Sequence, residues 1–128
     1  MKTLSGIVLT MLALSLAACA GTPDTRTIEE RMAERGYLIG PADQNIPRYR
    51  INSWSSVNDR YLTVRSGVND HYLIELMQPC FGLESAFSIG IGTPTTRVDR
   101  FGSVLVRDID GRVERCRIDN IYLLDRVE

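Results

Sequence analysis

Histidine and lysine are almost absent from this chain of 128 residues. The single histidine, His71, gives little support to a catalytic triad or to a zinc site built on imidazole groups. The single lysine is Lys2, so almost every basic side chain is an arginine, whose planar guanidinium group binds carboxylate or phosphate through paired hydrogen bonds. Acidic and basic residues are nearly balanced, 16 against 15, which argues against a nucleic-acid-binding protein.

Recognised catalytic and metal-binding motifs are also lacking. No serine lies in a G-x-S-x-G sequence, and the cysteines show no CxxC spacing. The run Asp108-Ile109-Asp110-Gly111 lacks the further ligands of a calcium-binding loop and is typical of a turn. The run Gly90-Ile91-Gly92 lacks the third glycine of a dinucleotide-binding loop. The sequence therefore predicts a protein that is not an enzyme, with no catalytic residue, no metal and no cofactor.

Only one long apolar run is present, at residues 4–16, and it carries no charge. It is shorter than the roughly 20 residues that a membrane-spanning helix needs. Lys2 gives the start of the chain one positive charge, and the small residues Ala17 and Ala18 follow the run. This order is typical of a secretory signal peptide, so we expect residues 1–18 to be absent from the mature protein.

The end of that run, Leu16-Ala17-Ala18-Cys19, resembles the lipobox of bacterial lipoproteins. The resemblance implies that Cys19 becomes the first mature residue and carries acyl chains such as palmitate on its thiol and amino groups. In Gram-negative lipoproteins an aspartate after this cysteine retains the protein in the inner membrane. Ala20 therefore implies the inner leaflet of the outer membrane, with the domain facing the periplasm. The alternative is an ordinary cleaved signal peptide that leaves Cys19 without lipid.

The three cysteines then divide into one lipid-bearing residue and one pair. Because the periplasm is oxidising, we predict a disulfide between Cys80 and Cys116. Closing a loop of this length contributes roughly 3–4 kcal/mol on the chain-entropy model. Two free thiols or a metal-binding pair remain the alternatives.

The mature chain is expected to begin with a tether and a short helix. Residues 19–26 form the lipidated N-terminus and a polar tether. Thr27-Ile28-Glu29-Glu30 has the form of a capping box, which predicts a helix over residues 28–35 that ends at Gly36. Ile28 and Met32 give this helix a narrow apolar stripe, so the segment at residues 27–36 either docks on the domain or frays. Residues 37–128 are expected to form a single β-rich domain.

The patterns from residue 48 onward are those of strands. Strands are expected at residues 48–54, 61–65 and 71–77, the last two forming a hairpin around a turn at residues 66–70. Alternation in the third strand places His71 and Glu75 together on one face, and we expect His71 to be exposed. Residues 81–93 combine the pattern of one helical turn with that of a short strand around Gly90.

The last third of the chain predicts a second hairpin, with its turn at residues 110–112. This register pairs Val106 with Cys116 and Val104 with Ile118, so it buries Cys116 close to Cys80. A final separate strand is expected at residues 121–124. Together the elements predict a mainly β fold, a small antiparallel barrel or sandwich of about five to seven strands with a short N-terminal helix.

The same register places Arg107, Arg115 and Arg117 on the outer face of the hairpin, which makes them the best candidates for binding an anion or a partner. Three guanidinium groups suit lipid head groups, the carboxylates of peptidoglycan or an acidic envelope protein. Acidic neighbours, Glu114 and Asp119, offer the alternative of a neutralised, solvated surface. Trp54, the only tryptophan, is expected in the core or at its rim rather than as a ligand platform.

Several features of the mature part carry a wider resemblance: residues 72–76, the pairs Pro79-Cys80 and Gly82-Leu83, and the run Cys116-Arg117-Ile118. They resemble an uncharacterised family of small exported proteobacterial proteins, over roughly residues 45–125. The resemblance implies a disulfide-linked β-domain and no known activity.

Two functions follow as expectations. The first is a non-enzymatic envelope lipoprotein, a small binding or structural module at the periplasmic face of the outer membrane. The second is a periplasmic inhibitor or accessory subunit that docks on an envelope enzyme or assembly complex through residues 81–96.

Overall fold

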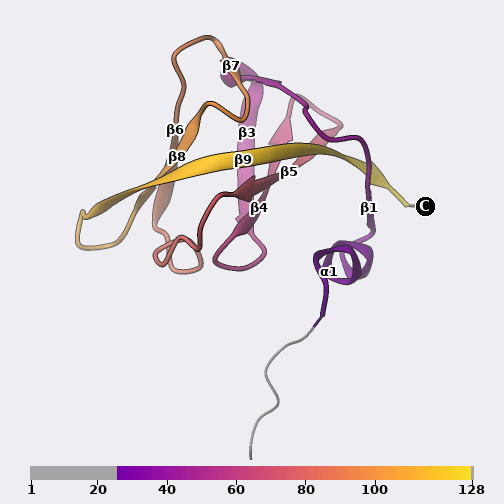
Figure 1. Cartoon of the computed structure of the whole chain (residues 1–128), viewed down its shortest axis with the longest axis horizontal. Coiled ribbons are helices and arrows are strands. Elements are labelled where there is room, and N and C mark those ends of the chain that lie inside the picture. Colours follow the sequence, from indigo (N-terminus) through magenta and orange to yellow (C-terminus); the bar gives the residue numbers. More distant parts are fainter. Residues whose placement is uncertain (1–25, 128) are drawn as a thin grey trace, which may run out of the picture.

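The computed structural model describes residues 26–127 (Figure 1). The predicted signal peptide, Cys19 and most of the predicted tether lie outside these residues. Among the described residues, no helix is long and apolar enough to cross a membrane. In chain order the elements are α1 (Ile28–Glu34), β1 (Tyr37–Ile39), β2 (Ile46–Pro47), the 3₁₀ helix η1 (Arg48–Arg50), β3 (Ile51–Ser56), β4 (Tyr61–Ser66), β5 (Asp70–Leu76), β6 (Ser88–Gly92), β7 (Arg97–Val98), β8 (Ser103–Arg107) and β9 (Val113–Arg126).

One curled antiparallel sheet forms most of the domain. Its strand order is β3-β4-β5-β9-β8-β6, and β1 also pairs with β9, which makes seven strands. The long strand β9 pairs with β8 through its first half and with β5 and β1 through its second half, so it holds the two parts of the half-barrel together (Figure 1). β2 and β7 form a separate short pair. The prediction of a small antiparallel β fold with an N-terminal helix is confirmed.

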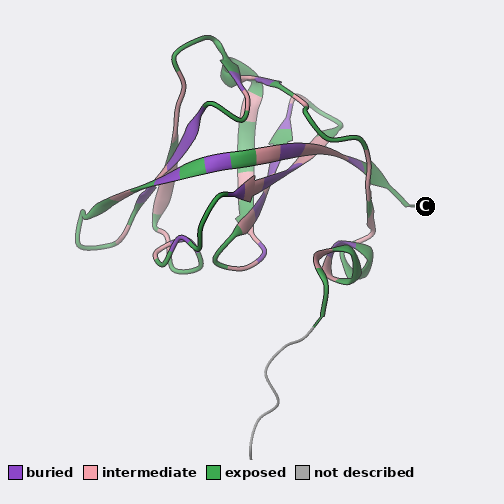
Figure 2. Ribbon diagram, viewed as in Figure 1, coloured by how far each residue is buried: buried purple, intermediate pink, exposed green. Residues whose placement is uncertain are grey.

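The main core fills the inside of the curled sheet. The hairpin β4–β5, which the sequence predicted, supplies Leu62, Ile74 and Leu76, all fully buried. Exposed and buried residues alternate along the first half of β9, with Cys116 and Ile118 turned inward (Figure 2). This alternation is the period of two expected of a strand with one face in the core and one in solvent.

The helix α1 covers part of the outer face of the sheet. Thr27 caps it as predicted, its hydroxyl oxygen accepting a hydrogen bond from the Glu30 N–H at 3.2 Å. Met32 is fully buried in a second, smaller core against Leu73 of β5 and Leu124 of β9. The helix therefore docks on the domain, because Leu73 and Leu124 give the sheet an apolar patch on the face opposite the main core.

Four local predictions were wrong. Residues 48–50 form η1 rather than the start of a strand. Residues 81–86 form tight turns with hydrogen bonds from the Leu83 N–H to the Cys80 carbonyl and from the Ala86 N–H to the Leu83 carbonyl, rather than one helical turn. The expected separate strand at residues 121–124 is part of β9, whose register against β5 shifts by one residue at Asp119.

The fourth error is the register of the β8–β9 hairpin. Val104 pairs with Cys116, and Val106 pairs with Glu114 rather than with Cys116. The reason is that Asp108 and Arg112 already bond to each other, from the Asp108 N–H to the Arg112 carbonyl at 3.1 Å, so the turn lies one residue earlier than predicted. Moving the turn by one residue changes the register by two, and every side chain keeps its predicted face.

Candidate functional site

The three predicted binding arginines lie on the outer face of the β8–β9 hairpin. Arg107 ends β8, and Arg115 and Arg117 lie in the first half of β9. All three are exposed, whereas their sequence neighbours Val106 and Cys116 are buried. We call this surface, made by Arg107, Arg115 and Arg117, the arginine face.

The arginines form a row rather than a cluster. Arg107 pairs with Val113, so Arg107 and Arg115 are diagonal neighbours whose Cα atoms lie about 7–8 Å apart. Arg115 and Arg117 are two residues apart on one strand, which separates their Cα atoms by about 7 Å. Because Arg107 and Arg117 stand at opposite ends of the row, the arginine face suits several anionic groups in succession better than one phosphate.

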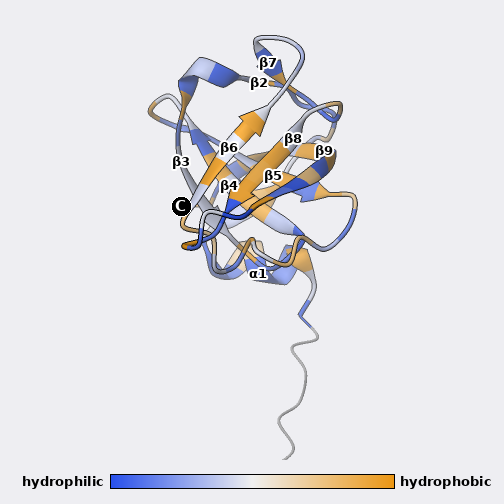
Figure 3. Ribbon diagram, turned by 90° about the vertical axis from the view of Figure 1, so that its left-hand side faces the viewer, coloured by the Kyte–Doolittle hydropathy of each residue, from blue (hydrophilic) through white to orange (hydrophobic). Residues whose placement is uncertain are grey.

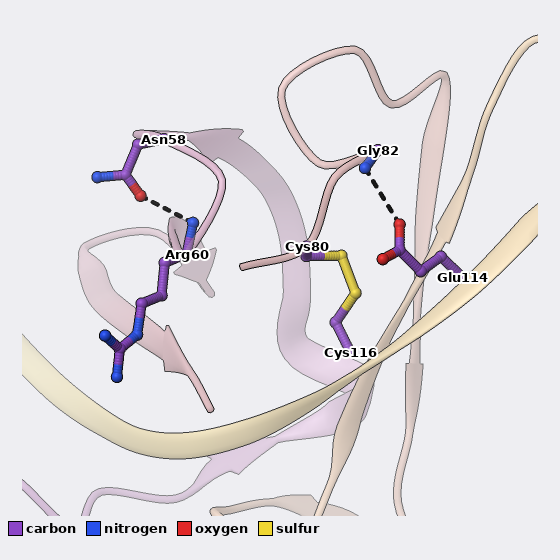
Figure 4. Close-up of a disulfide and its surroundings, with 6 residues drawn as sticks. All are labelled: Asn58, Arg60, Cys80, Gly82, Glu114 and Cys116. Atoms are coloured by element: carbon purple, nitrogen blue, oxygen red, sulfur yellow. Dashed lines mark hydrogen bonds between the residues drawn. A yellow bond between two sulfur atoms is a disulfide. The ribbon is translucent and has the colours of Figure 1, made fainter. Parts of the chain in front are cut away.

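Within the described part of the chain, the guanidinium groups of this face have no protein partner. Over residues 26–127, no hydrogen bond or ion pair engages the side chain of Arg107, Arg115 or Arg117. Glu114, a candidate neutralising residue in the sequence, turns to the other side of β9, where its carboxylate accepts a hydrogen bond from the Gly82 N–H at 3.1 Å (Figure 4). Asp119 is exposed, and in the same part of the chain it forms no ion pair.

A hollow of about 330 Å³ adjoins two of the arginines. Arg115 and Arg117 form one wall, and residues 77–79, which follow β5, form the other. The Met77 N–H donates a hydrogen bond to the Arg117 carbonyl at 3.0 Å, which fixes this segment beside β9. Because the side chain of Met77 is half exposed, the hollow has an apolar wall beside Arg115 and Arg117, and Glu114 also lines it.

A disulfide lies directly beneath the arginine face. Cys80 and Cys116 are at disulfide-bonding distance, with their Cα atoms 5.9 Å apart, as the sequence predicted (Figure 4). Both are buried, and the Cys80 N–H also donates to the Asp59 carbonyl at 2.6 Å. Since Cys116 lies between Arg115 and Arg117, the disulfide fixes the part of β9 that carries these arginines to the segment after β5.

The disulfide also decides the chemistry of the one metal-like grouping in the described part of the chain. The sulfurs of Cys80 and Cys116 and a carboxylate oxygen of Glu114 lie within 4.8 Å of one another. Thiolates bind metals, and a disulfide leaves neither sulfur as a thiolate. With the carboxylate of Glu114 bonded to Gly82, the grouping is a structural link between β9 and the turns after β5.

His71 lies on another part of the sheet. The sequence predicted an exposed side chain, but His71 is partly buried. The Oη atom of Tyr37 lies 3.3 Å from Nδ1 of His71, and the two ring centroids are 5.2 Å apart. Burial lowers the pKa of His71 below 6.5, and the positive charges of Arg126 and Arg65 lower it further, while Asp70 acts in the opposite direction. The sequence pattern missed the contact because Tyr37 belongs to β1, a strand of three residues far away along the chain.

Acidification below pH 6.5 is therefore expected to destabilise the fold through His71. The unfolded chain takes up the imidazole proton at a higher pH than the folded chain, so this contribution to stability is present above pH 6.5 and is lost as the pH falls through the lowered pKa. Urea unfolding between about pH 7.5 and pH 5 measures the effect, and the wild type should lose more stability than His71→Gln. Equal losses in the two proteins would contradict the prediction.

Tyr61 and Glu75 form a polar pair on the same side of the sheet as His71. The Tyr61 hydroxyl donates a hydrogen bond of 2.5 Å to the Glu75 carboxylate across β4 and β5. Burial and this carboxylate raise the pKa of Tyr61 to about 12. The phenol thus stays protonated as a donor, and Glu75 is tied to Tyr61 rather than to His71.

Trp54 lies on the edge strand β3, where it is partly buried against the main core, as expected of a residue at the core's rim. It lines a shallow hollow with Ile89 and Ile91 of the other edge strand, β6. The sequence did not predict the hollow beside Arg115, whereas the exposed Phe81 and Phe87 lie within residues 81–96, the segment expected to dock if the protein is an accessory subunit. The Pro79-Cys80 pair directly after a strand was the only local sign of the hollow beside Arg115.

Comparison with known proteins leaves the function open. No curated protein and no solved structure matches the chain. A family model matches residues 1–128, and its description is a family of unknown function, DUF6491. The resemblance to an uncharacterised family is thereby confirmed over a longer stretch than residues 45–125. This chain belongs to the family of unknown function DUF6491.

Proposed function

We propose that this protein is a non-enzymatic lipoprotein of the bacterial envelope, anchored through Cys19 in the inner leaflet of the outer membrane. Its domain faces the periplasm and binds an anionic partner through the arginine face. The anchor is supported by the lipobox-like run that ends at Cys19, directly after an uncharged apolar segment. A disulfide between buried cysteines fits the oxidising periplasm.

The observation that carries the binding role is the row of unpaired guanidinium groups. Arginine side chains on a solvated surface usually find carboxylates nearby, and here Glu114 is turned away from the row. A guanidinium group makes two parallel hydrogen bonds to one carboxylate. The spacing along β8 and β9 therefore suits the repeated carboxylates of an acidic envelope protein or of peptidoglycan, and the apolar wall at Met77 adds contact area beside Arg117.

A crosslinked pull-down from whole envelopes tests the role. The full chain is compared with the triple variant Arg107→Glu, Arg115→Glu and Arg117→Glu, which reverses the charge of the arginine face. We expect the amount of captured, crosslinked partner to fall at least about tenfold, since like charges across an interface cost several kcal/mol. Replacing the same three residues by lysine keeps the charge but removes the two-pronged geometry, and it should weaken capture less than the reversal does.

A second triple variant provides the matched control. Arg48, Arg100 and Arg126 are exposed arginines outside the arginine face, and changing them to glutamate alters the net charge by the same amount. This control should capture the same partners as the wild type. Identical partners from the arginine-face reversal and the wild type would refute the proposed binding role.

A further inference from the structure

One end of the molecule carries apolar side chains that nothing in the described chain covers. Phe81 is 84% exposed, Phe87 is 72% exposed and Ile109 is 84% exposed, and Val113 is more than half exposed. Phe81 and Val113 line one hollow, and the Phe87 N–H donates to the carbonyl of Arg107, which pairs with Val113. We call these four residues, Phe81, Phe87, Ile109 and Val113, the apolar end.

The segment that presents these phenylalanines is firmly held. Leu83 is fully buried between Phe81 and Phe87, and Cys80 is linked to β9 through Cys116. Glu114 fixes the Gly82 N–H from the other side (Figure 4). Phe81 is exposed although the nearby Cys80 and Leu83 are buried, so the segment is anchored while the phenylalanine ring points outward, which indicates a contact surface.

The described chain begins on the same lower side of the molecule as the turns that carry Phe81 and Phe87 (Figure 1). In Figure 1, the turns between β5 and β6 lie on the lower side of the molecule, as does α1, and the described chain begins below α1 in Figures 1 and 3. Fully extended, the chain between Cys19 and Arg26 spans at most about 25 Å. A lipid on Cys19 therefore keeps this lower side close to the bilayer, whereas η1, which is bonded to the loop before β7, lies on the upper side (Figure 1).

We propose that the apolar end rests in the interface of the lipid bilayer and orients the anchored domain, with Phe81 and Phe87 buried among the acyl chains and head groups. The inference depends on the lipid anchor of the proposed function and adds a second, reversible contact to it. Aromatic rings are favoured at membrane interfaces, and two attachments hold a protein far more firmly than one.

The charges around the apolar end fit a contact that depends on apolar burial. The chain from the end of β8 to the start of β9 includes two arginines, Arg107 and Arg112, and two aspartates, Asp108 and Asp110, so the formal charges of this turn balance. The contact should accordingly change little with salt or with the fraction of anionic lipid. The two surfaces meet where Arg107 pairs with Val113, and Arg115 and Arg117, further along β9, stay available to the partner of the arginine face.

Depth-dependent fluorescence quenching tests the proposal on the full-length lipidated protein. Trp54→Phe removes the native tryptophan, and Phe81→Trp or Phe87→Trp places one at the apolar end. Tyr49→Trp in the same background is the control, because Tyr49 is equally exposed at 83% but belongs to η1 at the opposite end. Each protein is reconstituted into vesicles of phosphatidylethanolamine and phosphatidylglycerol whose acyl chains carry bromine.

We expect brominated lipid to reduce the emission of Phe81→Trp and Phe87→Trp at least about twofold, with a shift to shorter wavelength, and to leave Tyr49→Trp unchanged. Should Trp54→Phe disturb the fold, the same substitutions are made with Trp54 retained and its emission subtracted. Mass spectrometry of each sample reports whether Cys19 carries lipid.

Lipidated Phe81→Trp and Phe87→Trp proteins that are quenched no more than Tyr49→Trp would overturn this inference and leave the proposed anchor intact. Crosslinking of those positions to an envelope protein instead would assign the apolar end to protein docking, also against the inference. Absence of lipid on Cys19 in the wild type would overturn the proposed function and this inference with it.

Discussion

Replacing both Cys80 and Cys116 by alanine is expected to lower the free energy of unfolding by roughly 3–4 kcal/mol. The two residues are 36 positions apart, and cross-linking a loop of this length removes much of the conformational freedom of the unfolded chain. Both side chains are also buried in the main core, so the variant loses packing as well. A loss of this size is a large fraction of the total stability of a domain, which is typically about 5–15 kcal/mol.

Urea unfolding of the wild type and the double variant, each with and without a thiol reductant, measures the effect. Reductant should destabilise the wild type toward the double variant and leave the variant unchanged. Cys19→Ala in the same assay is the matched control, because it removes a cysteine outside the disulfide. Free thiols at Cys80 and Cys116 in exported protein, or equal stability of wild type and double variant, would contradict the prediction.

The same variant also separates the roles of the disulfide. Cys80 begins the turns that present Phe81, and Cys116 lies between Arg115 and Arg117. Without the bond, the hydrogen bond from the Gly82 N–H to the Glu114 carboxylate still links β9 to these turns. Loss of the disulfide should therefore loosen the apolar end and the arginine face together, although no residue of either surface has been changed.

Features set by neighbouring residues were predictable from the sequence. The Thr27 cap, the β4–β5 hairpin and the alternation that separates Cys116 from Arg115 and Arg117 all depend on residues a few positions apart. The sequence predicted correctly which side chains of β8 and β9 face the core, although the predicted register was wrong. The reason is that a strand has a period of two, and moving the turn by one residue changes the pairing by two.

Features set by distant pairing were not predictable in the same way. β1, β2 and β7 have only two or three residues each, too few for a periodic pattern. β1 forms by pairing with β9, and β2 and β7 form by pairing with each other. The half-burial of His71 follows from Tyr37 on β1. The continuity of β9 through Asp119 follows from its pairing with β5, which no local preference of the polar pair Asp119-Asn120 would indicate.

The hollow beside the arginine face belongs to the second group. Its two walls come from β9 and from residues 77–79, which approach each other only when β5 pairs with the second half of β9. The sequence could assign Arg115 and Arg117 to an outer face, but it could not place Met77 opposite them. This is why the candidate site was predicted as a row of charges and is found as a row of charges beside an apolar wall.

Replacing Cys19 by serine is expected to abolish acylation and to release the protein from the membrane fraction. In the proposed anchor the Cys19 thiol accepts the diacylglycerol group, and a serine hydroxyl is a far weaker nucleophile. Each buried methylene of an acyl chain contributes about 0.8 kcal/mol to membrane binding, so losing two or three chains removes nearly all of the affinity. The apolar end alone, with its few exposed side chains, is too small a contact to hold the domain on the bilayer through fractionation.

Metabolic labelling with a palmitate analogue, followed by separation of membrane and soluble fractions, measures both effects in one sample. The wild type should be labelled and membrane-bound, with an intact mass that begins at Cys19 and includes the acyl chains. Cys80→Ser with Cys116→Ser is the matched control, because it removes the other two cysteines and should leave the label in place. A second variant, Ala20→Asp, should keep the label but move the protein to the inner membrane fraction. Label that persists in Cys19→Ser, or a wild-type mature chain without lipid, would instead mean that residues 1–18 are an ordinary signal peptide and that Cys19 has no part in anchoring.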